Sequence, residues 1–276
     1  MNHLRVRDPD PLSLFRLDGK VAFLSGATGL LGRPMARALA AAGAHVICNS
    51  RRQDAVEELV RDLKEAGFRA SGACFDVTDD AAVPKQIHRI GETQGRLDVL
   101  VNNASSGRAG TIESATLADF EQGYRVNVTA AFQLVQCALP LLKKSGADSA
   151  GGASVINVAS MYATVSPDPR IYGKSGANNP PYYGAAKAAL VQLTRYAACH
   201  LASDHIRVNC ISPGPFPNVK DLENDPEFHD RLKNKNPMNR TGDPREIQGP
   251  LLFLASDASS YVTGINLAVD GGWTAW

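Results

Sequence analysis

Long apolar runs are missing from this chain of 276 residues. No continuous apolar stretch approaches the roughly 18 residues that a membrane-spanning helix needs. Residues 1–16 are mixed and polar, contain two prolines, and lack the apolar core of a signal peptide. We therefore expect a cytoplasmic protein with no membrane partner, in which residues 1–16 form an N-terminal arm on the surface.

An excess of charge of one sign is also missing. The chain has 29 Lys and Arg against 28 Asp and Glu, a net charge of +1, and the two signs are interspersed. Nucleic acids and anionic membranes are bound by clustered positive charge. The composition therefore argues against both of these partners, and a small-molecule substrate is the expected ligand.

Patterned cysteines and histidines are absent as well. The five cysteines are scattered, none in a C-x-x-C spacing, and the six histidines show no metal-ligand spacing. Scattered cysteines in apolar runs are typical of small buried side chains in a reducing compartment. We expect no metal site.

What the chain does contain is a regular alternation of strand-like and helix-like stretches, with 44% hydrophobic residues to form a core. The predicted strands are 21–24, 45–49, 70–75, 97–101, 154–160, 206–211 and 266–270. The predicted helices are 33–42, 53–66, 81–93, two segments within 116–142, 183–200 and 244–256. Such alternation predicts an α/β fold: a doubly wound parallel sheet of about seven strands with helices on both faces, as a single domain over residues 17–276.

The first predicted strand leads into a glycine turn, residues 25–32, which read Ser-Gly-Ala-Thr-Gly-Leu-Leu-Gly, and then into a helix. A strand that enters a helix through glycines lets backbone N–H groups and the positive helix end meet a phosphate. A strand–helix–strand unit of about 30 residues is typical of dinucleotide binding. The turn therefore predicts a Rossmann-type cofactor site.

The end of the second predicted strand indicates which dinucleotide is bound. An acidic residue there would hold the adenosine ribose hydroxyls, but this chain has Ser50, followed by Arg51 and Arg52. The missing carboxylate removes repulsion against a 2′-phosphate, and two guanidinium groups can clamp it. NADP(H) is favoured and NAD(H) stays possible; the alternative is that both arginines are only solvated charges.

Polar residues follow several other predicted strands. Asp76 and Val77 follow the third, Asn102 to Ser105 the fourth, Ser160 ends the fifth, and Pro213 and Gly214 follow the sixth. Ligands of parallel sheets bind at the carboxyl ends of the strands. We therefore expect one active site at this edge of the sheet.

Tyr183 and Lys187 lie four residues apart in a helix-like run and should share one helix face. A free phenol has a pKa of about 10, and a nearby ammonium group is expected to lower it. The pair is thus a candidate proton-transfer device. The alternative is that Tyr183 only packs on an alanine-rich helix.

Two irregular stretches, residues 161–181 and 214–240, interrupt the alternation, with a possible short helix over 226–232. Long irregular loops in compact domains are usually functional, so we predict that both are active-site loops. Three cations in the predicted loops, Arg108, Arg170 and Lys174, can meet a substrate carboxylate or simply be solvated.

With these residues assembled, the chain resembles the classical short-chain dehydrogenase/reductase family from residue 17 to its end. The matching motifs are Ser25-Gly26-x-x-Gly29-x-x-Gly32, Asp76, Asn102-Asn103-Ala104, Asn127, Ser160, Tyr183-x-x-x-Lys187, Pro213-Gly214 and Val269-Asp270-Gly271-Gly272. The resemblance implies that Asn127, Ser160, Tyr183 and Lys187 are catalytic. Tyr183 would move the hydroxyl proton, Lys187 would lower its pKa and hold the nicotinamide ribose, Ser160 would bind the substrate oxygen, and Asn127 would hold a relay water.

The expected cofactor contacts combine the glycine turn, the strand ends and the resemblance. They are Ser25, Gly26, Thr28, Gly29, Leu30, Leu31, Gly32, Ser50, Arg51, Arg52, Asp76, Val77, Asn103, Ala104, Ser105, Tyr183, Lys187, Pro213, Gly214 and Phe216.

The sequence departs from the family pattern at two places that matter here. Leu30 stands where the second glycine of the turn is expected, and Ser160 and Tyr183 are further apart than in most members, by about ten residues within 161–181. The first change affects how closely the turn approaches the pyrophosphate. The second adds a wall to the substrate pocket.

The loop after Gly214 and the tail 271–276 resemble the gluconate 5-dehydrogenase-like subgroup, which handles sugar acids and polyols. The family is commonly tetrameric, so a homo-oligomer is expected; Trp273 and Trp276 fit either a subunit contact or a tail folded on its own subunit.

The leading hypothesis is an NADP(H)-preferring oxidoreductase of a secondary alcohol or ketone on a sugar acid, keto-sugar or polyol. The alternatives are a reductase of acyl-thioester or other lipophilic ketones, whose pocket would use Met161, Tyr162 and Phe216, and a dinucleotide-binding sensor without turnover.

Overall fold

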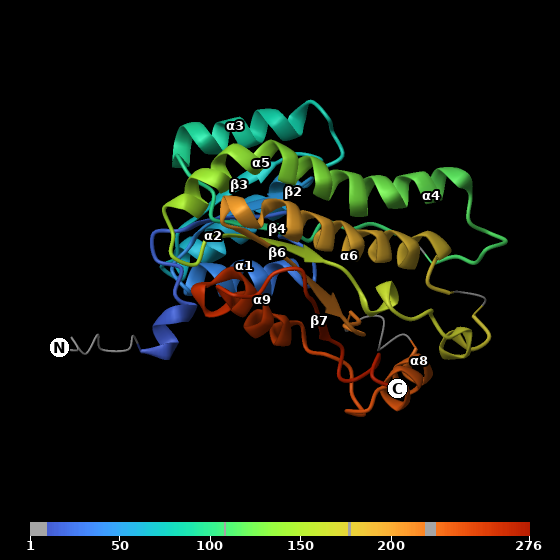
Figure 1. Cartoon of the computed structure of the whole chain (residues 1–276). Coiled ribbons are helices and arrows are strands. Elements are labelled where there is room, and N and C mark those ends of the chain that lie inside the picture. The colour runs from blue at the N-terminus through green and yellow to red at the C-terminus, as the bar shows by residue number, and fades with distance from the viewer. Residues whose placement is uncertain (1–9, 108, 176–177, 219–224) are drawn as a thin grey trace.

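Seven parallel strands form one sheet in the computed structural model, which describes residues 10–107, 109–175, 178–218 and 225–276 (Figure 1). The strands are β1 (Val21–Leu24), β2 (His45–Ser50), β3 (Ala70–Cys74), β4 (Val99–Asn102), β5 (Ala153–Val158), β6 (Ile206–Pro213) and β7 (Asn266–Val269). Their order across the sheet is β3-β2-β1-β4-β5-β6-β7, and every neighbouring pair is parallel. The predicted doubly wound sheet of seven strands is confirmed.

The central strands are buried along their whole length, as in β1, β4, β5 and β6. Continuous burial is expected of parallel strands that helices cover on both faces. The strand order reverses between β1 and β4, where Ala22 pairs with Val99 on one side and Val46 on the other. A crevice therefore opens at the carboxyl ends of these two strands.

Helices cover the two faces in separate groups (Figure 1). On one face lie α1 (Gly32–Ala41), α2 (Gln53–Glu65) and α9 (Gln248–Ala255), which bury Leu39, Leu59 and Leu254 in one core cluster. On the other lie α3 (Ala82–Gln94), α5 (Ala130–Ala147) and α6 (Pro181–Leu201), which bury residues such as Ile87 and Leu134 in a second cluster.

The predicted helical region 116–142 is one long run with an irregular middle. It consists of α4 (Leu117–Tyr124), a π-helical turn η2 (Arg125–Thr129) and α5. The run begins with a capping box, in which Thr116 and Asp119 satisfy each other's backbone N–H groups. The wide turn carries Asn127, and such turns are frequent at functional sites.

Short elements complete the chain. They are the 3₁₀ turns η1 (Pro11–Phe15), η3 (Met161–Ala163), η4 (Pro169–Tyr172), η5 (Ala202–Asp204), η6 (Pro244–Ile247) and η7 (Asp257–Ser259), and the helix α8 (Pro226–Lys235). The last of these is the short helix expected near 226–232. Leu17, directly after η1, is fully buried in the first core cluster, whereas residues 1–9 of the predicted arm lie outside the described residues.

The helical run Leu117–Ala147 is long and apolar enough to cross a membrane by length and average composition, although it contains no continuous apolar stretch of that length. Only 39% of its most apolar window is buried. The inner side of α5 nevertheless packs against α3 and the sheet with Leu134, Ala138 and Leu142. A single core helix with this packing is weak evidence for a membrane span.

All five cysteines are free thiols. Within the described ranges, no group of three or more histidine, cysteine or acidic side chains could hold a metal ion.

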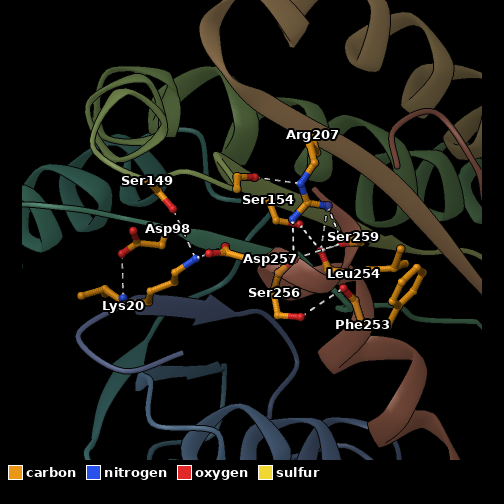
Figure 2. A network of polar contacts seen from close by, with 12 residues as sticks. Lys20, Asp98, Ser149, Ser154, Arg207, Phe253, Leu254, Ser256, Asp257 and Ser259 are labelled. Carbon is orange, nitrogen blue, oxygen red and sulfur yellow. Dashed lines mark hydrogen bonds and ion pairs between the residues drawn. The ribbon is translucent and has the colours of Figure 1, made fainter. Parts of the chain in front are cut away.

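A buried arginine ties the start of β6 to α9 and η7, at the edge of the sheet opposite the strand ends (Figure 2). The Arg207 guanidinium donates to the carbonyl oxygens of Gly151, Leu254 and Ser256 and to Ser259 Oγ, at 2.7–3.1 Å. Burial lowers the pKa of Arg207 to about 10, a shift that the charge of Asp257 opposes. This side chain therefore cross-links three segments that are distant in sequence.

Candidate active site

A cleft of about 540 Å³ lies at the carboxyl ends of the central strands. Every predicted cofactor residue except Ser25 lines it, and Ser160 lines it as well. The residues expected at this edge of the sheet therefore line a single cleft.

The glycine turn forms one wall of the cleft. Gly26 has a φ of +63°, and a Cβ added at Gly32 would lie only 2.2 Å from the Gly26 carbonyl oxygen. Ser25 lies behind the turn, where its Oγ accepts from the N–H groups of Asn103 and Ala104 at 2.9 and 3.0 Å. Side chains are excluded where the turn meets the start of α1, so backbone can approach a pyrophosphate there.

Leu30, the departure from the family pattern, is part of the cleft wall and is partly exposed. Gly29 and Gly32 keep the turn tight on either side of it. The cradle therefore fits a dinucleotide despite the missing glycine, with a leucine side chain at its rim.

The far end of the cleft carries the predicted clamp for a 2′-phosphate. Ser50 ends β2, and its Oγ accepts from Thr28 Oγ1 at 2.9 Å. The Arg51 side chain is largely exposed and pairs with Asp76 at 3.6 Å. Arg52 lies at the start of α2. A cation, a hydroxyl and the N-terminus of a helix thus converge at this end.

Ser160 and Tyr183 meet at the inner end of the cleft. Their hydroxyls are in polar contact, and Ser160 Oγ also accepts from the Tyr162 N–H at 3.1 Å. Gly184 permits this approach, because a Cβ there would lie 3.0 Å from the Tyr162 carbonyl oxygen. Turn η3 can therefore lie against the first turn of α6, which brings the end of β5 to Tyr183.

Lys187 lies beneath the Tyr183 ring, with its Nζ 5.6 Å from the ring centre. The ammonium group donates to the Val158 carbonyl oxygen at 2.7 Å, and burial lowers the pKa of Lys187 to about 8. Burial also raises the pKa of Tyr183, although its contact with Ser160 lowers it. In the protein alone the pKa of Tyr183 therefore lies above its ordinary value, and not below it as expected, because desolvation is the largest effect on it.

Asn127 lies one layer behind the cleft. Its Nδ2 donates to the Gly123 carbonyl oxygen, and its Oδ1 accepts from Ser105 Oγ, both at 2.8 Å. The π-helical turn places this amide between α4 and the loop after β4. Asn127 thus holds Ser105, which itself lines the cleft.

The neighbouring tyrosine has a different environment. Tyr182 is buried, its ring makes an edge-on contact with Phe120, and Gly123 leaves room for it. Tyr183, one residue later on α6, faces the cleft. Tyr183, and not Tyr182, stands four residues before Lys187 in the sequence, and it is also the ring that reaches the cleft.

A second cavity, of about 370 Å³, shares Ser105, Ser106 and Tyr183 with the cleft and includes no residue of the glycine turn. Its walls come from the loop after β4 and from the insertion, and they include Ser105, Tyr172 and Asn179. Of the three expected cations, Arg170 is exposed and paired with Asp168 at 2.7 Å, and Lys174 is exposed, while Arg108 lies outside the described residues. No charged side chain from the described part of the chain lines this cavity.

Several residues of the cleft were not expected from the sequence. They are Asn49, Phe75, Ser106, Val126, Val158 and Ala159. Most of them are next to an expected residue in the chain, such as Phe75 before Asp76. Adding one neighbouring residue to the predicted site at each strand end would therefore have included them. Val126 gives no such signal, because only the π-helical turn brings it to the cleft.

The chain is similar to known proteins over most of its length. A family model described as "Enoyl-(Acyl carrier protein) reductase" matches residues 26–274. A 3-oxoacyl-[acyl-carrier-protein] reductase of rhamnolipid biosynthesis from Pseudomonas aeruginosa is 33% identical over 94% of this chain and 98% of its own length. A 7alpha-hydroxysteroid dehydrogenase from Clostridium sardiniense is 31% identical over 94% of both chains.

A solved structure agrees with these relatives. A gluconate 5-dehydrogenase from Burkholderia cenocepacia, in complex with NADP and tartrate, superposes with a TM-score of 0.86 at 31% identity, over 97% of this chain and all of that one. The names of these proteins describe oxidoreductases with different substrates. The chain belongs to the short-chain dehydrogenase/reductase family and is an oxidoreductase that acts on an alcohol or ketone group with a nicotinamide dinucleotide.

Proposed function

We propose that the protein is an NADP(H)-preferring reductase and dehydrogenase of a secondary alcohol or ketone on a polar substrate, such as a keto-sugar, a polyol or a sugar acid. The observation that carries the proposal is the contact between the Ser160 and Tyr183 hydroxyls at the inner end of a cleft whose outer end carries Ser50 and Arg51. The subgroup resemblance and the gluconate 5-dehydrogenase structure support the substrate class.

The chain's own residues supply the proton and the electrostatic part of the reaction. A bound nicotinamide supplies or accepts the hydride at the reacting carbon. Tyr183 gives its phenolic proton to the carbonyl oxygen during reduction and takes it back during oxidation. Ser160 donates a hydrogen bond to the same oxygen while negative charge develops on it. The Lys187 ammonium, 5.6 Å from the Tyr183 ring, favours the phenolate that reduction leaves behind.

The preference for NADP(H) rests on the end of β2. Ser50 offers no repulsion to a phosphate, and Arg51 is exposed and can leave Asp76 to meet one. A charge-assisted bond to phosphate is about twice as strong as a neutral hydrogen bond.

Replacing Arg51 by alanine is expected to weaken NADPH binding by about 10- to 100-fold, because one charge-assisted bond contributes about 1.5–3 kcal/mol. NADH, which lacks the 2′-phosphate, should bind within about twofold of wild type. The measurement is a fluorescence titration with both dinucleotides. Arg61→Ala, which removes an exposed arginine further along α2, is the control. Equal losses for the two cofactors would contradict the role of Arg51.

The substrate pocket is the cavity next to Tyr183. Its described polar groups are hydroxyls and amides, from Ser105, Ser106, Tyr172, Asn178 and Asn179. Such groups suit a neutral polyhydroxylated molecule better than an alkyl chain. A sugar acid would need a cation that the described walls do not provide.

Two side chains that a pocket for a lipophilic ketone was expected to use lie elsewhere. Met161 is buried in a cluster with Ile171, Leu232 and Trp273, and Phe216 lines the cleft itself. Neither side chain lines the cavity beside Tyr183. A 3-oxoacyl-[acyl-carrier-protein] reductase is among the relatives, so acyl thioesters are included as the alternative substrate class in the assay below.

Absorbance of the nicotinamide tests the function directly. The purified protein is assayed with polyols and sugar acids plus NADP⁺, and with keto-sugars and 3-ketothioesters plus NADPH, each repeated with the other cofactor. Turnover of a polyol, keto-sugar or sugar acid supports the proposal. Turnover of thioesters alone would replace its substrate class, and tight nucleotide binding without any turnover would favour a sensor.

We also propose that the chain forms a cytoplasmic homotetramer. The outer side of α5 and α6 exposes Phe132 by 49% and Tyr196 by 66%, beside a shallow apolar cavity of about 240 Å³. A second copy of the chain would cover the exposed apolar side of Leu117–Ala147, whose length and composition also fit a membrane span. Trp276 is 75% exposed and is free for a further contact, whereas Trp273 is folded into its own subunit.

Sedimentation velocity is expected to give four times the mass of the chain. Phe132→Glu should split the assembly into smaller species, because a buried charge at an apolar interface is strongly unfavourable. Tyr261→Glu, at a fully exposed tyrosine near the start of β7, is the control and should leave the mass unchanged. A wild-type monomer, or an intact Phe132→Glu tetramer, would refute this interface.

A further inference from the structure

The connection between β3 and α3 contributes a short loop, residues 76–80, to the wall of the cleft. Asp76 and Val77 line the cleft, and Asp76 pairs with Arg51 at 3.6 Å, directly after the end of β2. The glycine turn receives the pyrophosphate and Tyr183 marks the nicotinamide end, so the opposite end receives the adenosine. The loop 76–80 therefore borders the adenosine part of a bound dinucleotide.

The loop has its own internal bonds. The Thr78 N–H and hydroxyl both donate to Asp76 Oδ1, at 2.9 and 2.8 Å. Desolvation raises the pKa of Asp76, but these two bonds and the charge of Arg51 together bring it below its ordinary value. A carboxylate that accepts from the residue two positions later shapes a turn locally. Such a turn does not fix the loop on the rest of the protein.

Arg125 supplies the anchor between this loop and the neighbouring helix. Its Nη2 donates to the Thr78 carbonyl oxygen at 2.8 Å and pairs with the Asp80 carboxylate at 2.6 Å. Gln133 on α5 adds a longer contact, from Nε2 to the Asp80 carbonyl oxygen at 3.2 Å. Hydrogen bonds from a charged donor are the stronger ones. The Arg125 guanidinium is therefore the main tie from this helical run to the loop among the described residues.

Arg125 is also the first residue of the π-helical turn η2, which carries Val126 and Asn127. A bond from the Ala130 N–H to the Arg125 carbonyl oxygen closes the turn. Val126 lines the cleft, and it borders a narrow void together with Val77, so the two valines lie close together. The bond between Arg125 and the loop thus joins two segments that each give an apolar side chain to the same wall.

We propose that Arg125 is a positioning residue for the cofactor: it holds the loop 76–80 against turn η2, so that the adenosine meets a wall that is already ordered. A loop that is fixed before binding avoids the free-energy cost of ordering it. Because Asp80 neutralises Arg125, the effect is the same for NADPH and NADH. This role differs from that of Arg51, which is proposed to contact the 2′-phosphate, and it does not depend on the substrate.

Replacing Arg125 by methionine removes both contacts and keeps much of the length of the side chain. It is expected to raise the Kd values of NADPH and NADH by the same factor, about five- to 20-fold, because both contain adenosine. Fluorescence titrations measure the two values. Displacement of NADPH by ADP-ribose, which lacks the nicotinamide, should show the same factor. Arg245→Met, at an exposed arginine that pairs with Asp243 in turn η6, is the matched control and should leave all three values unchanged.

Hydrogen–deuterium exchange without cofactor tests the position of the loop directly. Exchange in residues 76–81 should be faster in Arg125→Met than in wild type, while exchange within β5 stays the same. Asp80→Ala is a second variant for which folding is not at risk, since the Asp80 side chain is 69% exposed. It removes the ion pair alone and should raise the Kd of NADH and of ADP-ribose by about two- to fivefold, with faster exchange in the same residues.

Two results would overturn the proposal. Unchanged Kd values in Arg125→Met, with or without a loss of stability, would leave Arg125 a structural role only. A loss for NADPH alone would make it a ligand of the 2′-phosphate. If Arg125→Met does not fold, Asp80→Ala decides, and unchanged Kd values and exchange in that variant would overturn the proposal in the same way.

Discussion

Replacing Tyr183 by phenylalanine is expected to lower kcat by at least about 1,000-fold, while the Kd for NADPH changes by less than about twofold. General acid–base catalysis by a placed side chain contributes about 10²–10⁴-fold, and this variant removes the only atom of Tyr183 that can carry the proton. The ring, its packing and Lys187 beneath it stay in place. Steady-state rates with NADPH and a reduced ketone, together with a nucleotide titration, measure the two quantities separately.

The adjacent tyrosine provides the control. Tyr182→Phe changes the same kind of group one residue earlier on α6, but at a buried ring that packs against Phe120. It should keep kcat within about threefold of wild type, with at most a modest loss of stability. Comparable losses of turnover in the two variants, or a loss of NADPH binding in Tyr183→Phe, would show that Tyr183 has a structural rather than a catalytic role.

The sequence predicts the fold and the residues that line the cleft well, because both follow from local patterns. Each strand is a short apolar run and each helix has its own period and end signal, so the alternation determines a parallel sheet. The polar residues after β1, β3, β4 and β5 then meet at one edge, whatever the details of packing. Even the choice between Tyr182 and Tyr183 needs only the spacing to Lys187.

Properties that depend on burial and on contacts between distant segments are not predictable in this way. The spacing of Tyr183 and Lys187 indicates attraction between a phenolate and an ammonium group, but desolvation of both side chains outweighs it in the protein alone. The pairing of Tyr172 with Phe228 joins residues of two irregular stretches with no shared pattern. Trp273 resembles a surface residue in the sequence, and only the folded tail shows that it is buried with Met161.

Arg207 is another residue whose importance the sequence does not show. It lies in a predicted strand, where a charged residue would be expected at an exposed end, yet it is buried and donates to Gly151, Leu254, Ser256 and Ser259 (Figure 2). Other donors also reach the Leu254 and Ser256 carbonyl oxygens, from Ser154 and Ser259. The Gly151 oxygen, in contrast, depends on Arg207 among the contacts of the described residues.

Arg207→Met is expected to lower the free energy of unfolding by about 2–4 kcal/mol, because it removes several charge-assisted bonds and leaves a buried carbonyl oxygen unpaired, while methionine fills much of the same space. Urea titrations at one fixed protein concentration, with NADP⁺ absent, measure the change. Lys20→Met is the matched control, because Lys20 makes a single ion pair in the same network, with Asp257 at 2.7 Å, and its loss should destabilise the fold less than the loss of the four Arg207 hydrogen bonds. Since the network lies at the opposite edge of the sheet from Tyr183, kcat of the folded Arg207→Met protein should stay within about twofold of wild type. Equal destabilisation by the two variants would show that the burial of Arg207 adds nothing to the stability of the fold.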